Sequence, residues 1–84
     1  MNEQEARRRL REWVASVSGR VKPEEVADQT PILEKRLIRS LHVPDLLLLI
    51  EELRGQPVDP ARLQPGSLRD IDTIWRNFLA DRPA

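Results

Sequence analysis

Hydrophobic residues recur every three or four positions along most of the chain, which is the spacing of amphipathic helices. Near the N-terminus, Asn2 followed by Glu5 resembles a capping box, and Gly19 is a natural helix stop. We therefore expect a first helix over residues 3–18. Its apolar stripe consists of Ala6, Leu10, Trp13, Val14 and Val17.

A long irregular stretch follows, from Gly19 to about Arg39. Pro23 and its two acidic neighbours suit the first turn of a short helix, because proline and carboxylates are favoured there. A loop of this length inside a small domain commonly serves a function. We expect four apolar side chains to pin it to the core, namely Ile32, Leu33, Leu37 and Ile38.

A second helix is predicted over residues 41–54, ending at Gly55, and it is apolar nearly all round. Leu41 and Leu48 are seven residues apart on a face of their own. Either the long loop covers these two leucines, or they contact a partner. The core face is expected to hold Val43, Leu46, Leu47, Ile50 and Leu53.

Pro44 leaves the start of this second helix open. If the helix begins at Leu41, Pro44 costs it a backbone hydrogen bond. If the regular helix begins only at Pro44, Ser40 lies on a turn before it, since proline suits the first helical position.

A short third helix is predicted over residues 59–63, with Asp59 as its cap and Pro60 at its first position. Strand-like alternation is not found in the sequence. The pattern therefore predicts an all-α fold in one domain, residues 1–84. We expect this domain to be a four-helix bundle with a long first loop and a short third helix.

The last helix is expected to follow the break at Pro65 and Gly66. Ser67 is its predicted cap, and Asp70 three residues later would complete a capping box. The buried stripe of this helix consists of Leu68, Ile71, Ile74, Trp75, Phe78 and Leu79.

Composition narrows the classes of function. The 84 residues carry 14 basic and 14 acidic side chains, so the net charge is zero, which argues against a DNA-binding domain. The chain has no cysteine and one histidine, His42, so no metal cluster is expected. No signal peptide or bilayer-spanning run is seen, and we expect a cytoplasmic protein without a membrane partner. No catalytic constellation is found, which predicts that the protein is not an enzyme.

Residues 28–79 resemble the acyl carrier protein family. The resemblance lies in the order of the elements and in four sequence words. These are Thr30-Pro31-Ile32-Leu33, Leu37-Ile38-Arg39-Ser40-Leu41, the stretch from Leu46 to Glu52, and the stretch from Val58 to Leu63.

The resemblance implies a carrier fold in which Ser40 is the attachment site of a 4'-phosphopantetheine arm. The arm would carry an acyl or aminoacyl thioester in a fatty-acid-like or secondary-metabolite pathway. The implied partners are a phosphopantetheinyl transferase, an acyl- or aminoacyl-loading ligase and a downstream synthase or transferase. Peptidyl carriers usually have two glycines shortly before the serine, and the chain lacks them. A free-standing, monomeric acyl or aminoacyl type is therefore expected.

The expected docking surface consists of Arg39, Leu41, Leu48 and Glu51. Arg39 departs from the family, which usually has an acidic residue before the serine. It either offsets the acidic residues of the second helix or pairs with the attached phosphate, and in both cases we expect a dedicated set of partners.

Three further alternatives remain open on sequence alone. In the first, Ser40 serves only as an N-cap, since serine is a favoured capping residue. In the second, the chain is a non-catalytic helical interaction module without a prosthetic group. The basic run Arg7, Arg8, Arg9 and Arg11 is either a solvated helix face or a docking patch for an acidic partner.

Overall fold

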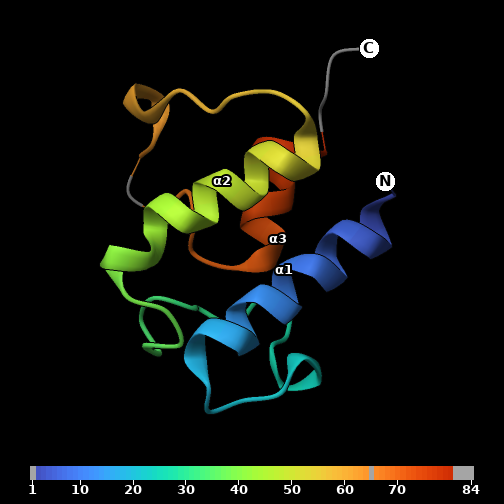
Figure 1. Ribbon diagram of the computed structural model, residues 1–84, viewed down its shortest axis with the longest axis vertical. Coiled ribbons are helices and arrows are strands. Elements are labelled where there is room, and N and C mark those ends of the chain that lie inside the picture. The colour runs from blue at the N-terminus through green and yellow to red at the C-terminus, as the bar shows by residue number, and fades with distance from the viewer. Residues whose placement is uncertain (1, 65, 81–84) are drawn as a thin grey trace.

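The computed structural model describes residues 2–64 and 66–80, and over these residues it is helical with no strand. This described part of the chain contains three α-helices: α1 (Glu3–Ser18), α2 (Val43–Arg54) and α3 (Ile71–Ile74). α3 continues without a break into a π-helical turn, η4 (Trp75–Leu79), and we call residues 71–79 the last helix. Figure 1 shows α2 lying across α3, with α1 alongside.

α1 has the predicted bounds, and its caps explain why. The Glu5 N–H donates to Asn2 Oδ1 at 2.8 Å, which satisfies one of the first helical amides. At the other end Gly19 takes a left-handed conformation, φ 69°, and donates its N–H to the Ala15 carbonyl at 2.9 Å.

The start of α2 differs from the prediction that places it at Leu41. The α-helix begins at Val43, and a 3₁₀ turn, η2 (Ser40–His42), precedes it. Pro44 is therefore the second residue of α2, where a backbone N–H would have no partner within the helix. The proline fits, and Ser40 lies on the turn before the helix.

The predicted third helix is a single 3₁₀ turn, η3 (Pro60–Arg62). Asp59 caps it as expected, because its Oδ1 accepts from the Ala61 N–H at 3.0 Å. A second such turn, η1 (Pro23–Glu25), lies where Pro23 predicted one. The described residues thus contain three α-helices with short turns between them.

The last helix begins later than predicted. Its cap is Asp70, whose Oδ1 accepts from the Thr73 N–H at 2.6 Å, and Ser67 is not the cap. Ser67 Oγ accepts from the Gln64 N–H at 3.0 Å instead. The Arg69 carbonyl accepts from the Ile32 N–H at 2.9 Å, so the residue before the cap is drawn into a contact with the long loop.

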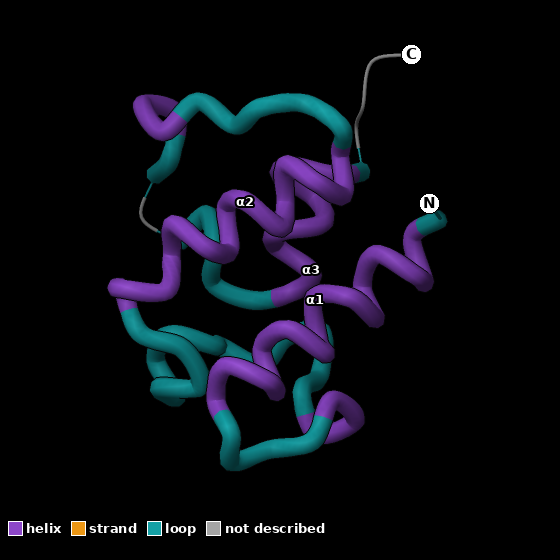
Figure 2. Tube along the Cα trace, viewed as in Figure 1, coloured by secondary structure: helices purple, strands orange, loops and turns teal. Residues whose placement is uncertain are grey.

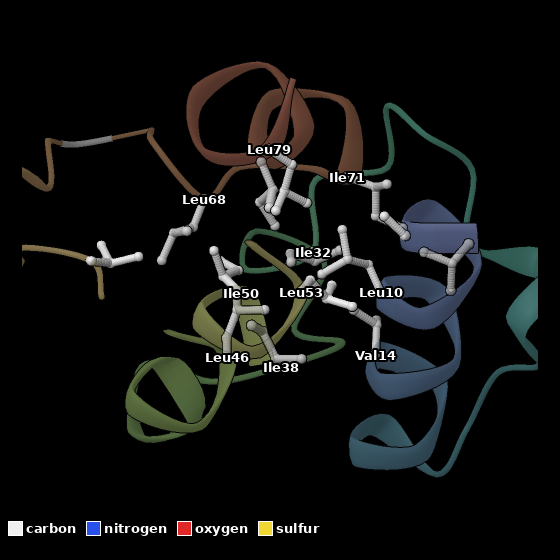
Figure 3. Packing of buried hydrophobic residues seen from close by; sticks show 14 residues of the cluster. Leu10, Val14, Ile32, Ile38, Leu46, Ile50, Leu53, Leu68, Ile71 and Leu79 are labelled. Atoms are coloured by element: carbon white, nitrogen blue, oxygen red, sulfur yellow. The ribbon is translucent and has the colours of Figure 1, made fainter. Parts of the chain in front are cut away.

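The core lies where α1, α2, the last helix and the loop between α1 and α2 meet (Figure 3). Of the residues on the predicted stripes, six are only partly buried at its margin, namely Trp13, Val17, Val43, Leu47, Trp75 and Phe78. The largest fully enclosed side chains are Leu10, Val14, Val26, Ile32, Ile38, Leu46, Ile50, Ile71 and Ile74.

The long loop, residues 19–39, is pinned to the core as predicted. Ile32 and Ile38 are fully buried, while Leu33 and Leu37 are half-buried. A second backbone bond joins it to the last helix, from the Asp72 N–H to the Asp28 carbonyl at 2.9 Å. Figure 2 shows this loop crossing from the end of α1 to the turn that opens α2.

Arg7 connects three parts of the fold. It donates to Glu3 at 2.8 Å and to Asp72 at 3.0 Å, lies 3.4 Å from Asp28, and sits over the Trp75 ring at 5.7 Å. Burial alone would lower the pKa of Arg7, but the hydrogen bonds to Asp72 and Glu3 and the charge of Asp28 raise it overall. The hydrogen bond from Arg7 lowers the pKa of Asp72. The guanidinium thus joins α1 to the loop and to the last helix.

Candidate functional site

Ser40 lies on a turn that two neighbouring residues close. The Arg39 N–H donates to His42 Nδ1 at 2.9 Å, and the His42 N–H donates back to the Arg39 carbonyl at 2.9 Å. Arg39 has extended backbone and occupies the N-cap position, so Ser40 is the first residue of the turn. His42 takes the part that a Glu or Gln plays in a capping box.

The Ser40 hydroxyl is consequently left out of the cap. Ser40 is exposed, and no described residue forms a hydrogen bond with its Oγ. The alternative in which Ser40 is a plain N-cap is therefore wrong, because Arg39 holds that position. Ser40 is therefore accessible to a partner from outside.

The two leucines of the second face are exposed, and the long loop does not cover them. Leu41 is 67 % exposed and Leu48 is 63 % exposed, and they are the large hydrophobic residues that stand out on the described surface. Leu41 is next to Ser40, and Leu48 lies in the middle of α2. An apolar side chain at each of these places can contact a partner that approaches the serine.

The charges around the serine are mixed. Arg39 is exposed and forms no ion pair with any described residue. Glu51, a predicted docking residue, is half-buried and accepts from the Val58 N–H at 2.8 Å. Glu52 lies 3.4 Å from Arg9. Asp45 is the exposed carboxylate nearest to Leu41 along the chain.

An open groove of about 960 Å³ lies beside Ser40. The end of α1, the later part of the long loop and the turn η2 form its walls. Three arginines line it, Arg20, Arg36 and Arg39, and none of the described lining residues is acidic. The other lining residues are Val17, Ser18, Leu33, Leu37, Ile38, Ser40, Leu41 and His42.

A direct contact fixes the wall of this groove. Arg20 Nη2 donates to the Arg36 carbonyl at 2.7 Å and so joins the end of α1 to the loop. Arg36 has a left-handed backbone, φ 58°, which is uncommon for a residue other than glycine. Sequence patterns did not single out Arg20 or Arg36, because an irregular loop has no periodicity that would place them together.

The basic run on α1 is a paired helix face, because each of its arginines forms an ion pair with a carboxylate. The interpretation as a docking patch is accordingly not favoured. Beyond the contacts of Arg7 already given, the pairs are Arg8 with Glu5 and Glu12, Arg9 with Glu52, and Arg11 with Asp28.

Among the residues described, no group of three or more His, Cys, Asp or Glu side chains is arranged to hold a metal ion. Across that same part of the chain, no helix has both the length and the apolar character needed to cross a bilayer.

Comparisons of the chain with protein-family models, with curated proteins and with solved structures give no match.

Proposed function

We propose that the protein is a carrier that holds an acyl or aminoacyl thioester on a 4'-phosphopantetheine arm attached to Ser40. The observation that carries this proposal is the state of the serine. It stands at the head of a helix, its hydroxyl is exposed, and Arg39 and His42 close the turn in its place. The protein would not itself be an enzyme, because a partner would make and break each bond.

The arrangement of the helices supports the proposal. A long helix, a long loop, a second helix, a short turn and a last helix follow one another in the order expected of the acyl carrier type. In this interpretation η3 (Pro60–Arg62) stands in for the short third helix of a four-helix bundle. Ser40 then falls where the long loop meets α2, at the edge of the bundle.

The attachment chemistry is a group transfer. Ser40 Oγ attacks the phosphorus of coenzyme A that bears the pantetheine arm, and the P–O bond to the nucleotide half breaks. Adenosine 3',5'-bisphosphate leaves, and the hydroxyl proton passes to a base of the transferase. The product is a phosphodiester that bears one negative charge at neutral pH. The arm ends in a thiol, which this cysteine-free chain does not otherwise supply.

The surface around the serine supports protein partners. A phosphopantetheinyl transferase, an acyl- or aminoacyl-loading ligase and a downstream synthase or transferase must each approach Ser40. Leu41 and Leu48 offer them apolar contacts, and Arg39 offers a charge that is not paired within the described chain. We propose Glu51 as a weaker contributor, because its carboxylate already accepts from the Val58 N–H.

The proposal predicts a covalent modification at Ser40. The protein is incubated with coenzyme A, magnesium and a broad-range phosphopantetheinyl transferase, and its intact mass is recorded. A gain of one phosphopantetheinyl group is expected in the wild type and in Ser16→Ala, which removes an exposed hydroxyl on α1. No gain is expected in Ser40→Ala. An unchanged mass with several transferases, including those of its own genome, would refute the carrier function.

A second candidate is a helical interaction module without a prosthetic group. Two features together favour it. Two leucines are exposed, and Arg39 stands where carriers usually have an acidic residue. The mass measurement separates the two candidates, since an interaction module gains no mass.

A further inference from the structure

The cationic side chains of this protein fall into two groups. The four arginines of α1 all form ion pairs with carboxylates. Residues 20–39 carry five cationic side chains, and none of these forms an ion pair with any described residue. Those five are Arg20, Lys22, Lys35, Arg36 and Arg39.

Three of these five cations meet at one place. Arg20, Arg36 and Arg39 line the groove beside Ser40, and the described lining includes no carboxylate to offset them. A protein of zero net charge therefore presents a local excess of positive charge next to the proposed attachment site. Between the arginines lie apolar side chains, among them Val17, Leu33 and Leu37.

This lining suits a ligand that is both apolar and anionic. The volume of about 960 Å³ is in the range of small-molecule sites. Arginine is the side chain best matched to carboxylate and phosphate, because its planar fork donates two parallel hydrogen bonds. The apolar residues match the methylene groups of an acyl chain.

The backbone conformation of Arg36 also supports a binding role for this groove. A non-glycine residue with φ 58° carries a conformational cost that glycine or asparagine would reduce. The chain nevertheless has an arginine there, held by the hydrogen bond from Arg20 to its carbonyl. Strained positions of this kind concentrate at functional sites.

The negative charge of the arm alone does not balance the positive charge of the groove. The phosphodiester on Ser40 brings one negative charge, and three arginines face the groove. The excess remains available to a second anion on the same arm. An aminoacyl cargo would bring a cationic ammonium group, which the arginines would repel.

We infer that the cargo is an acyl group that ends in a carboxylate and that the groove receives it, with Arg36 and Arg20 binding the carboxylate. This inference rests on the proposed carrier function and narrows it. It selects carboxyacyl groups over neutral acyl groups and over aminoacyl groups.

The test compares two cargoes of the same chain length. A broad-range transferase attaches the arm from hexanoyl-coenzyme A or from adipyl-coenzyme A, so the loaded forms differ by the terminal carboxylate. The urea midpoint of each form is measured at low salt, together with the NMR shifts of the arginine Nε–H groups. Binding of the tethered carboxylate to the native state stabilises it.

The adipyl form should have an unfolding equilibrium constant roughly three- to tenfold lower than the hexanoyl form. Its Arg36 and Arg20 Nε–H resonances should shift. Arg36→Asn tolerates the left-handed backbone, so the variant should fold and lose the difference between cargoes. Arg8→Gln, on the paired face of α1, should keep that difference.

The outcomes distinguish the two levels of the hypothesis. Loading without any difference between adipyl and hexanoyl forms overturns the cargo inference and leaves the carrier function standing. A difference that survives in Arg36→Asn also overturns it, since the groove would not be its source. Failure to gain the arm from coenzyme A or from either ester, with several transferases including those of its own genome, refutes the carrier function, and the cargo inference with it.

Discussion

At the scale of single residues, the division of labour between Arg39, Ser40 and His42 is the feature on which the site depends. His42 Nδ1 accepts from the Arg39 N–H, so the turn is closed without the serine hydroxyl. The sequence predicted the position of Ser40, since serine at a helix start is a local pattern. It did not predict that a histidine closes the turn, because histidine is an uncommon residue for that part.

Replacement of His42 should weaken this turn. We expect His42→Ala to lower the free energy of unfolding by about 0.5–1.5 kcal/mol, the net value of one hydrogen bond. His42→Gln should recover most of the loss, because glutamine at this position can accept from the same N–H. Urea unfolding of the three proteins measures the effect. Equal stability of His42→Ala and wild type would show that the bond contributes nothing in solution.

Asp72 makes the stability of the folded state depend on pH in the acid range. The hydrogen bond from Arg7 holds the pKa of Asp72 below its ordinary value of 3.8. A carboxylate with a lowered pKa stabilises the folded state above its ordinary value, and the contribution is lost as the pH falls through the folded value. Arg7, with its raised pKa, stays charged throughout.

The stability of wild type relative to Asp72→Asn should therefore be constant from about pH 7 to pH 5 and should shrink below about pH 4. Urea midpoints measured at a series of pH values test this. A gap between the two proteins that does not change down to pH 2.5 would contradict the ion pair with Arg7.

At the scale of elements, helix ends fixed by neighbouring residues were predicted better than ends fixed by distant ones. The bounds of α1 follow from Asn2 and Gly19, which act within a turn of the helix. The start of the last helix was misplaced at Ser67. Asp70 is equally suited to cap a helix, and the hydrogen bond between Ile32 and Arg69 lies outside any local pattern.

α2 offers a matched pair of substitutions on opposite faces. Leu48→Glu changes an exposed side chain, so the free energy of unfolding should stay within about 0.5 kcal/mol of wild type. Leu46→Ala, two residues earlier, should lose about 2–5 kcal/mol because Leu46 is fully buried. Chemical denaturation measures both.

The same Leu48→Glu protein then reports on docking. If Leu48 contacts partners, the folded variant should be modified at Ser40 more slowly than wild type under the same transferase conditions. A large loss of stability in Leu48→Glu would instead place the leucine in the core and contradict the exposed position.

At the scale of the whole molecule, zero net charge conceals an uneven distribution. The arginines of α1 form ion pairs with carboxylates of α1 itself, of the loop, of α2 and of α3. The five cations of the loop form no ion pair with any described residue, and three of them line the groove beside Ser40. Composition alone could not reveal this, because counting charges takes no account of which ones meet. The helical class was predictable from periodicity, but the groove needed the path of the irregular loop.

Two backbone hydrogen bonds hold the long loop against the C-terminal part of the fold, one from Ile32 to Arg69, just before the cap of the last helix, and one between Asp28 and Asp72 within that helix. The stretch from Leu33 to Arg39 that lines the groove follows directly from the Ile32 anchor, and the fully buried Ile38 anchors it again near its end. The groove wall is therefore anchored near both of its ends, which disfavours its movement as a lid. On the proposed carrier function, a tethered cargo would enter this groove through its open mouth without a rearrangement of the wall.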